Sequence, residues 1–127
     1  MFGMEPLIIE AKEDSPKINL DKLNNIFQIS GNSFTDDPVP YYLPIIDWIE
    51  KYKLDPNKLT IFEFKLNYIN TASSKQIANL LTKLEEARGM TDLTVKWYYH
   101  KDDEDMFDEG LALKTMIKIN FELIKTD

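Results

Sequence analysis

The chain has 127 residues, of which 43% are hydrophobic and 12% aromatic, and its formal net charge is -7. This length fits a single domain with a sizeable core. The acidic balance argues against binding to nucleic-acid phosphates and against docking on anionic lipid, because both need a basic surface. The absence of cysteine excludes disulfides, thiol catalysis and thiolate metal sites. The remaining partner classes are another protein or a small molecule.

The opening stretch, MFGMEPLIIEA, lacks the basic start and the long apolar run of a secretory signal peptide. No stretch approaches the apolar length that a membrane span needs. We therefore expect a cytoplasmic protein without membrane insertion. Residues 1–14 are expected to form a loose N-terminal segment with room for a short strand at Leu7–Ala11, and residues 15–127 to form the domain.

The first elements of the domain are two short strands. They are predicted at Ile18–Leu20 and Ile26–Ser30, joined by an Asp- and Asn-rich turn at residues 21–25. Gly31 and Asn32 are expected to end the second strand.

The next stretch, TDDPVPYYLPIIDWIEKYK, begins with acidic residues and prolines, which are typical of a helix entrance. Tyr42, Ile45, Ile46 and Ile49 follow the spacing of one apolar helical stripe. Pro44 is expected in the first turn, where its missing N–H group costs little.

Two later stretches, LTIFEFKLNYI and LTVKWYYH, alternate apolar and polar residues, which is typical of strands with one buried face. A sheet covered on both faces would show continuous apolar runs instead. We therefore expect helices mainly on one face and water on the other. The residues predicted to face the core are Phe62, Phe64, Leu66, Tyr68, Leu93, Val95, Trp97 and Tyr99. Tyr98 falls on the wet face, where it is a candidate for partner binding.

A second helix is predicted between these strands, because four apolar residues have helical spacing and Gly89 can close it. Those residues are Ile77, Leu80, Leu81 and Leu84. A third helix is predicted in KDDEDMFDEGLALKTMIKI, which begins with acids and ends with lysines, as the helix dipole favours. NFELIKT reads as a final strand. The predicted order is ββαβαβαβ, an α/β domain.

Signatures of an enzyme are mostly absent. His100 is the single histidine, and the four glycines are too scattered for a phosphate-binding loop. The acidic segment DDEDMFDE at 102–109 could attract a divalent cation, but it lacks the glycine and spacing of a calcium loop. A charged helix start is the favoured interpretation of this segment. A small ligand- or metal-binding domain that uses it is the alternative, and no cofactor is expected.

The segment NTASSK precedes the second predicted helix with three hydroxyl side chains. Ser73 followed by Gln76 fits a capping box with Ser73 as N-cap. Thr71 would then lie two positions before the cap, exposed and with a free hydroxyl. A phosphoryl group there would carry about -1.5 to -2 charges near the free N–H groups of the helix start, and Lys75 could contact it. Helix capping alone is the plainer explanation of the hydroxyl groups.

Six stretches in fixed order, SPKINLD, FQISGNSF, YYLPIIDWIEKY, FEFKLNYINTASSK, LLTKLEEA and VKWYY, resemble the SiaC family of bacterial regulatory phosphoproteins. The similarity spans about residues 15 to 126. It implies a STAS-like domain, similar to anti-sigma-factor antagonists, with a mixed sheet backed by helices.

The resemblance also implies a function without catalysis by the chain itself. Family members are switched by a serine/threonine kinase and a PP2C-type phosphatase, and the phosphorylated threonine maps to Thr71. The unphosphorylated form is expected to bind and activate a diguanylate cyclase, which raises cyclic-di-GMP and promotes aggregation or biofilm growth. Asn70, Ser73, Ser74 and Lys75 would shape the partner surface around Thr71.

Two positions depart from the family pattern. Relatives usually carry serine directly after the threonine, where this chain has Ala72. Relatives also tend to have a PEN-like segment before the first helix, where this chain has Thr35-Asp36-Asp37. The preference of the kinase and the identity of the effector are therefore left open, as is the use of Ser73 or Ser74 as an alternative acceptor.

Overall fold

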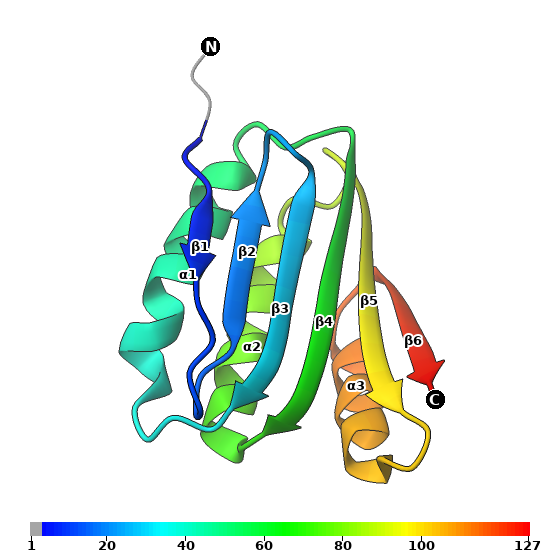
Figure 1. Cartoon of the computed structure of the whole chain (residues 1–127). Coiled ribbons are helices and arrows are strands. Elements are labelled where there is room, and N and C mark those ends of the chain that lie inside the picture. The colour runs from blue at the N-terminus through cyan, green and yellow to red at the C-terminus, as the bar shows by residue number, and fades with distance from the viewer. Residues whose placement is uncertain (1–3) are drawn as a thin grey trace.

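The computed structural model describes residues 4–127 and shows an α/β fold with a six-stranded sheet and three helices (Figure 1). The strands follow one another across the sheet in chain order, from β1 to β6. The elements are β1 (Leu7–Ile9), β2 (Lys17–Asp21), β3 (Ile26–Ser33), α1 (Pro38–Tyr52), β4 (Leu59–Ile69), α2 (Thr71–Glu85), β5 (Asp92–His100), α3 (Glu104–Met116) and β6 (Asn120–Thr126).

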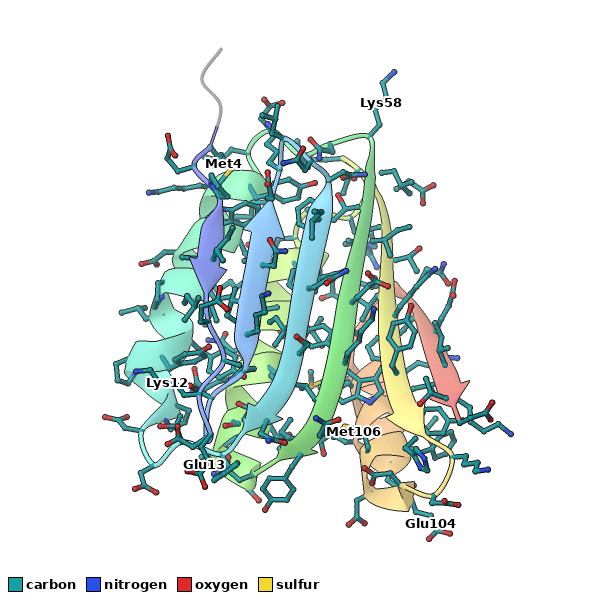
Figure 2. All side chains as sticks on the ribbon, in the orientation of Figure 1. Met4, Lys12, Glu13, Lys58, Glu104 and Met106 are labelled. Atoms are coloured by element: carbon teal, nitrogen blue, oxygen red, sulfur yellow. The ribbon has the colours of Figure 1, made fainter. Side chains whose placement is uncertain are left out.

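The sheet is mixed, as the resemblance implied. The pairs β1–β2 and β2–β3 are antiparallel, whereas β3–β4, β4–β5 and β5–β6 are parallel. Each parallel pair is connected through one helix, and all three helices cover the same face of the sheet (Figure 1). The prediction of a sheet covered on one face is confirmed. Polar side chains stand on the other face (Figure 2).

The covered face and the helices enclose one core that is rich in aromatic side chains. Phe64 and Trp97 lie on neighbouring strands with ring centroids 5.3 Å apart, and both are fully buried. The Trp97 indole N–H donates to the backbone oxygen of Met106 at 3.0 Å, which fixes the ring beneath α3. Gly110 lets α3 approach closely, because a Cβ atom there would lie 2.4 Å from Trp97 Cδ1. The position of α3 therefore depends on a residue without a side chain.

The short strand for which the sequence left room at Leu7–Ala11 is present as β1, Leu7–Ile9. β1 pairs with β2 in the register Leu7 to Leu20 and Ile9 to Ile18, so part of the segment expected to be loose belongs to the sheet. Leu7 and Ile9 are half-buried against the core, which explains why this short stretch is held in place. Residues 1–3 of that predicted segment lie outside the described residues.

Gly31 and Asn32 do not end β3, contrary to the prediction. The strand continues to Ser33, and its register with β4 shifts between Gly31 and Asn32. Gly31 has φ of 107°, a conformation that favours glycine, so it forms an irregularity within the strand rather than a turn. The prolonged strand places Ser33 opposite Ile69, directly before α2.

The prediction for Pro44 is also wrong. The helix α1 begins at Pro38, so Pro44 lies inside it, beyond the first turn. Pro44 is exposed to solvent, which lets water satisfy the helix carbonyl group that loses its partner.

The second helix, α2, ends at Glu85, and Gly89 adopts φ of 91° in the turn beyond it.

Candidate functional site

The candidate site is the turn between β4 and α2, at the edge where the parallel strands end. Asn70 is the N-cap of α2, with Oδ1 accepting a hydrogen bond from the Ser73 N–H at 2.8 Å. Its own N–H donates to the Ser33 oxygen at 3.0 Å, which ties the cap to β3. Asn70 is thus held from both sides, and the helix starts at a fixed place.

This start differs from the predicted capping box. Ser73 is not the cap, because Asn70 lies three residues earlier and caps a helix as well as serine does. Ser73 instead lies in the first turn, fully buried. Its Oγ has no hydrogen-bond partner among the described residues. It therefore packs as part of the core and does not contribute to the surface.

Thr71 is the first residue of α2 and its side chain is exposed. The N–H groups of Thr71 and Ala72 have no protein acceptor among residues 4–127, as is usual at a helix start. Lys75 is also exposed and follows Thr71 by four residues, so the two side chains share a helix face. No carboxylate of the described residues lies within 4.0 Å of the Lys75 amine. An anion on Thr71 would therefore meet free donors and a free positive charge.

Ser74 differs from its neighbours because it contacts another helix. Its hydroxyl donates to Oε1 of Glu109 in α3, and both side chains are half-buried. The sequence did not indicate this contact, since 35 residues separate the two partners. Their types gave no signal either, because Ser74 reads as a helix-start residue and Glu109 as part of a charged helix.

Tyr98 lies away from this turn, on the open face of the sheet. Its hydroxyl donates to Glu63 Oε2 at 2.8 Å, and the Lys65 amine lies 5.1 Å from the centre of its ring. Burial raises the pKa of Tyr98 to about 12, and the hydrogen bond to the Glu63 carboxylate acts in the same direction. The structure thus groups Asn70, Ser74 and Lys75 around Thr71 and places Tyr98 in a separate polar network.

Two aromatic residues near the turn were missed by the sequence analysis. Tyr68 was predicted to face the core, but 55% of it is exposed, because the pairing of β4 with β3 skips Asn67, so that Ile69 rather than Tyr68 packs against the core. Its ring packs edge-on against Phe34, with centroids 5.7 Å apart. Tyr68 is exposed and Phe34 partly exposed, and aromatic side chains that reach the surface are typical of sites that contact another protein.

The acidic segment 102–109 divides into separate roles. Asp103 is the N-cap of α3, with Oδ1 accepting from the Met106 N–H at 3.0 Å. Glu104 and Asp105 occupy the first turn, where they complement the helix dipole. Within the part of the chain that the structure describes, these side chains do not gather into a group of three metal-binding residues. The segment is a charged helix start, as the favoured interpretation had it.

β4 and β5 separate at the same edge of the sheet. Their pairing ends at Phe64 and Trp97, although β4 continues beside β3 to Ile69 and β5 beside β6 to His100. Figure 1 shows the two strands drawing apart toward the end where α2 and α3 begin. The split contains a crevice of about 740 Å³, within the usual size of ligand and peptide sites. Its lining residues are Lys65, Leu66, Asn67, Tyr98, Tyr99, His100, Asp102, Asp103 and Thr126.

Comparison with known proteins identifies the family. The model of the SiaC family regulatory phosphoproteins matches residues 9–126. This chain belongs to the SiaC family. An uncharacterised protein of Pseudomonas aeruginosa strain UCBPP-PA14 is 28% identical over 102 residues, which cover 80% of this chain and 81% of that protein.

The solved structures agree with the fold. SiaC of Pseudomonas aeruginosa matches with a TM-score of 0.86 and 22% identity, over 97% of this chain and 100% of that chain. A crystal structure of the diguanylate cyclase SiaD in complex with its activator SiaC, also from Pseudomonas aeruginosa, matches with a TM-score of 0.84 and 23% identity. That match covers 94% of this chain and 99% of the other. None of the described helices is long and apolar enough to cross a membrane.

Proposed function

We propose that this SiaC family member is a regulatory phosphoprotein whose switch is Thr71 and whose unphosphorylated form binds and activates a diguanylate cyclase. A serine/threonine kinase transfers the γ-phosphoryl group of ATP to Thr71 Oγ, which loses its proton, and ADP leaves. A PP2C-type phosphatase hydrolyses the ester. The chain itself catalyses neither step. The SiaC–SiaD complex of Pseudomonas aeruginosa supports the choice of effector, because the same fold activates a cyclase there.

The observation that carries this proposal is the position of Thr71. It is exposed at the first residue of α2, between a rigid strand and a capped helix, so a kinase can reach it while the fold holds it still. The free N–H groups of Thr71 and Ala72 and the Lys75 amine would hold the phosphoryl oxygens near the helix start. Phosphorylation then changes the charge of the surface at a position that the fold leaves accessible.

The effect on a partner follows from the charges around the turn. The β1–β2, β3–α1 and β5–α3 loops reach the same end of the molecule as the α2 start (Figure 1), and they carry exposed acids such as Glu13, Asp36 and Asp102, which Glu104 at the start of α3 follows. Figure 2 shows Glu13 and Glu104 at this end. An effector that docks here meets a negative surface, and a further dianion changes that surface sharply. We expect the phosphorylated form to bind the cyclase more weakly.

The test uses the cognate kinase with ATP and intact-mass spectrometry. Wild-type protein should gain one phosphate, and Thr71→Ala should gain none. Replacement of the buried Ser73 by alanine is the matched control and should leave phosphorylation intact. Full phosphorylation of the Thr71→Ala variant would place the acceptor elsewhere and reject the proposal.

A second measurement concerns the effector. Calorimetric titration of the cyclase with unmodified and phosphorylated protein should give clearly weaker binding for the phosphorylated form. Equal affinity of the two forms would leave the switch without a mechanism, even if Thr71 is the acceptor.

A further inference from the structure

The split between β4 and β5 divides one end of the molecule into two halves. In one half, α2 packs against α1 behind β2, β3 and β4; in the other, α3 packs against β5 and β6 (Figure 1). The two halves remain joined at the far end, where β4 and β5 pair up to Phe64 and Trp97. The Arg88 guanidinium also donates there to the Lys118 oxygen at 3.0 Å. The two halves are thus separate at the split end and joined at the opposite end.

Among the described residues, two hydrogen bonds between side chains cross the split end. On the open face, Tyr98 of β5 donates to Glu63 of β4. On the helix side, the Ser74 hydroxyl of α2 donates to the Glu109 carboxylate of α3. We call this second contact the Ser74–Glu109 bridge. It ties α3 to the start of α2, and therefore to the turn that contains Thr71.

A phosphoryl group on Thr71 would compete directly with the Ser74–Glu109 bridge. Ser74 follows Thr71 by three residues, so the two side chains are neighbours on the helix surface. Phosphoryl oxygens are strong acceptors that carry most of a dianion, and the Ser74 hydroxyl can donate to them as readily as to a carboxylate. The same dianion repels Glu109. The helix start and Lys75 favour the phosphoryl group, whereas α2 offers Glu109 no hydrogen-bond donor besides Ser74 among the described residues.

We propose that the Ser74–Glu109 bridge holds the β4/β5 crevice narrow and that phosphorylation of Thr71 opens the crevice by breaking this bridge. The inference rests on the proposed function only in taking Thr71 as the modified residue. Its consequence is that the effect of phosphorylation reaches α3 and the crevice-lining residues Tyr99, His100, Asp102 and Asp103, and not only the surface beside Thr71. A partner could therefore read the phosphorylation state without contacting the phosphoryl group.

The first arm of the test needs no modification. Amide hydrogen exchange of the full chain is measured by mass spectrometry or NMR for wild type and for Glu109→Gln, which weakens the bridge at nearly constant shape. Amides from Tyr99 to Phe107 should exchange about tenfold faster in the variant, since one charge-assisted hydrogen bond is lost. Amides of the paired region Phe62–Phe64 should stay as protected as in wild type, which separates local opening from general destabilisation. Asp108→Asn, an exposed neighbour on α3, is the matched control and should behave as wild type.

The second arm uses protein with phosphothreonine placed at position 71 during translation, so that no kinase is needed. The modified wild type should show the same faster exchange from Tyr99 to Phe107. The modified Glu109→Gln variant should show no further increase, because its bridge is already lost.

Either of two results would overturn the proposal. One is unchanged exchange in Glu109→Gln; the other is an equal acceleration by phosphothreonine with and without Glu109. Both can be seen whichever residue a kinase uses. Failure of the bridge mechanism is thus distinguishable from failure of Thr71 as the natural acceptor, which the mass measurement with the kinase decides.

Discussion

Two turns leave the same edge of the sheet, one leading into α2 and one into α3, and they are capped in the same way. Asn70 Oδ1 accepts from the Ser73 N–H at 2.8 Å, and Asp103 Oδ1 accepts from the Met106 N–H at 3.0 Å. In each case the cap side chain bonds to the N–H three residues later, and a parallel strand feeds the turn. The pattern of cap hydrogen bonds alone does not distinguish the two helix starts.

The charges distinguish them. The first turn of α3 contains Glu104 and Asp105, whereas the first turn of α2 contains no acid. The α2 turn offers Thr71 and free N–H groups instead, and the carboxylate that contacts it, Glu109, comes from α3. The positive end of the α3 dipole is already complemented permanently, while that of α2 is available to an anion that can be added and removed. The comparison teaches that the residues after the cap, more than the cap, decide whether a helix start can accept an added anion.

The largest expected effect comes from disturbing the packing that holds α3 in place. In Gly110→Ala, the new Cβ would lie 2.4 Å from Trp97 Cδ1 and 2.7 Å from Leu123 Cδ2. Trp97 is fully buried and cannot move aside cheaply. We expect the free energy of unfolding to fall by about 1–3 kcal/mol, although alanine is the better helix former. Urea denaturation followed by circular dichroism measures this.

The control for Gly110→Ala is Leu111→Ala, on the exposed side of the same helix turn. Its effect should stay within about 0.5 kcal/mol. A stability of Gly110→Ala equal to wild type would show that α3 is held loosely, and the two helix starts would then differ in rigidity as well as in charge.

The next prediction tests the α2 cap. Asn70→Ala should lower the free energy of unfolding by about 1 kcal/mol, because the Ser73 N–H loses its acceptor. Ser73→Ala should be neutral or slightly stabilising, since it removes a buried hydroxyl group without a protein partner. Thermal and urea denaturation of both variants decide between the two possible caps.

Asp103→Ala extends this test to α3 and should cost about as much as Asn70→Ala. If Ser73→Ala were the costly change and Asn70→Ala the neutral one, the helix would begin at the position that the capping-box pattern predicted, and Thr71 would lie outside it.

Much of the fold could be predicted from the sequence because its signals are strong. The alternation in β4 and β5 predicted both strands and the side that carries the helices. The misplaced boundaries all involve residues with two possible roles. Gly31 can end a strand or allow an irregularity within it, and a helix accepts Pro44 on its wet side. The short segment Leu7–Ile9 forms a strand because it pairs with β2, and a local sequence pattern does not show such pairing.

The candidate site was predictable only in its local part. Asn70, Thr71 and Lys75 are neighbours in the chain, so the pattern placed them together. The cap register was missed because Asn70 and Ser73 are both good caps, and the choice depends on the strand that leads into the turn. The contact of Ser74 with Glu109 joins two helices, and the exposure of Tyr68 follows from the register shift between β3 and β4. Both depend on pairings between segments that are distant in the chain.

The smallest effect tests the charge difference between the two turns directly. Ala72 and Asp105 occupy the same position, the second residue of their helices. Ala72→Asp should raise the free energy of unfolding by about 0.3–1 kcal/mol at low salt, because it gives α2 the carboxylate that α3 already has. The gain should lie near the lower limit while Glu109 is present and grow in a Glu109→Gln background, since one like charge then disappears. High salt should remove most of this gain in the free energy of unfolding.

Asp105→Asn is the reciprocal change. It should lower the free energy of unfolding by a similar amount, with the same salt dependence. An Ala72→Asp effect that is negative or insensitive to salt would mean that the start of α2 does not favour anions, and the distinction between the two turns would have to be sought outside their charges.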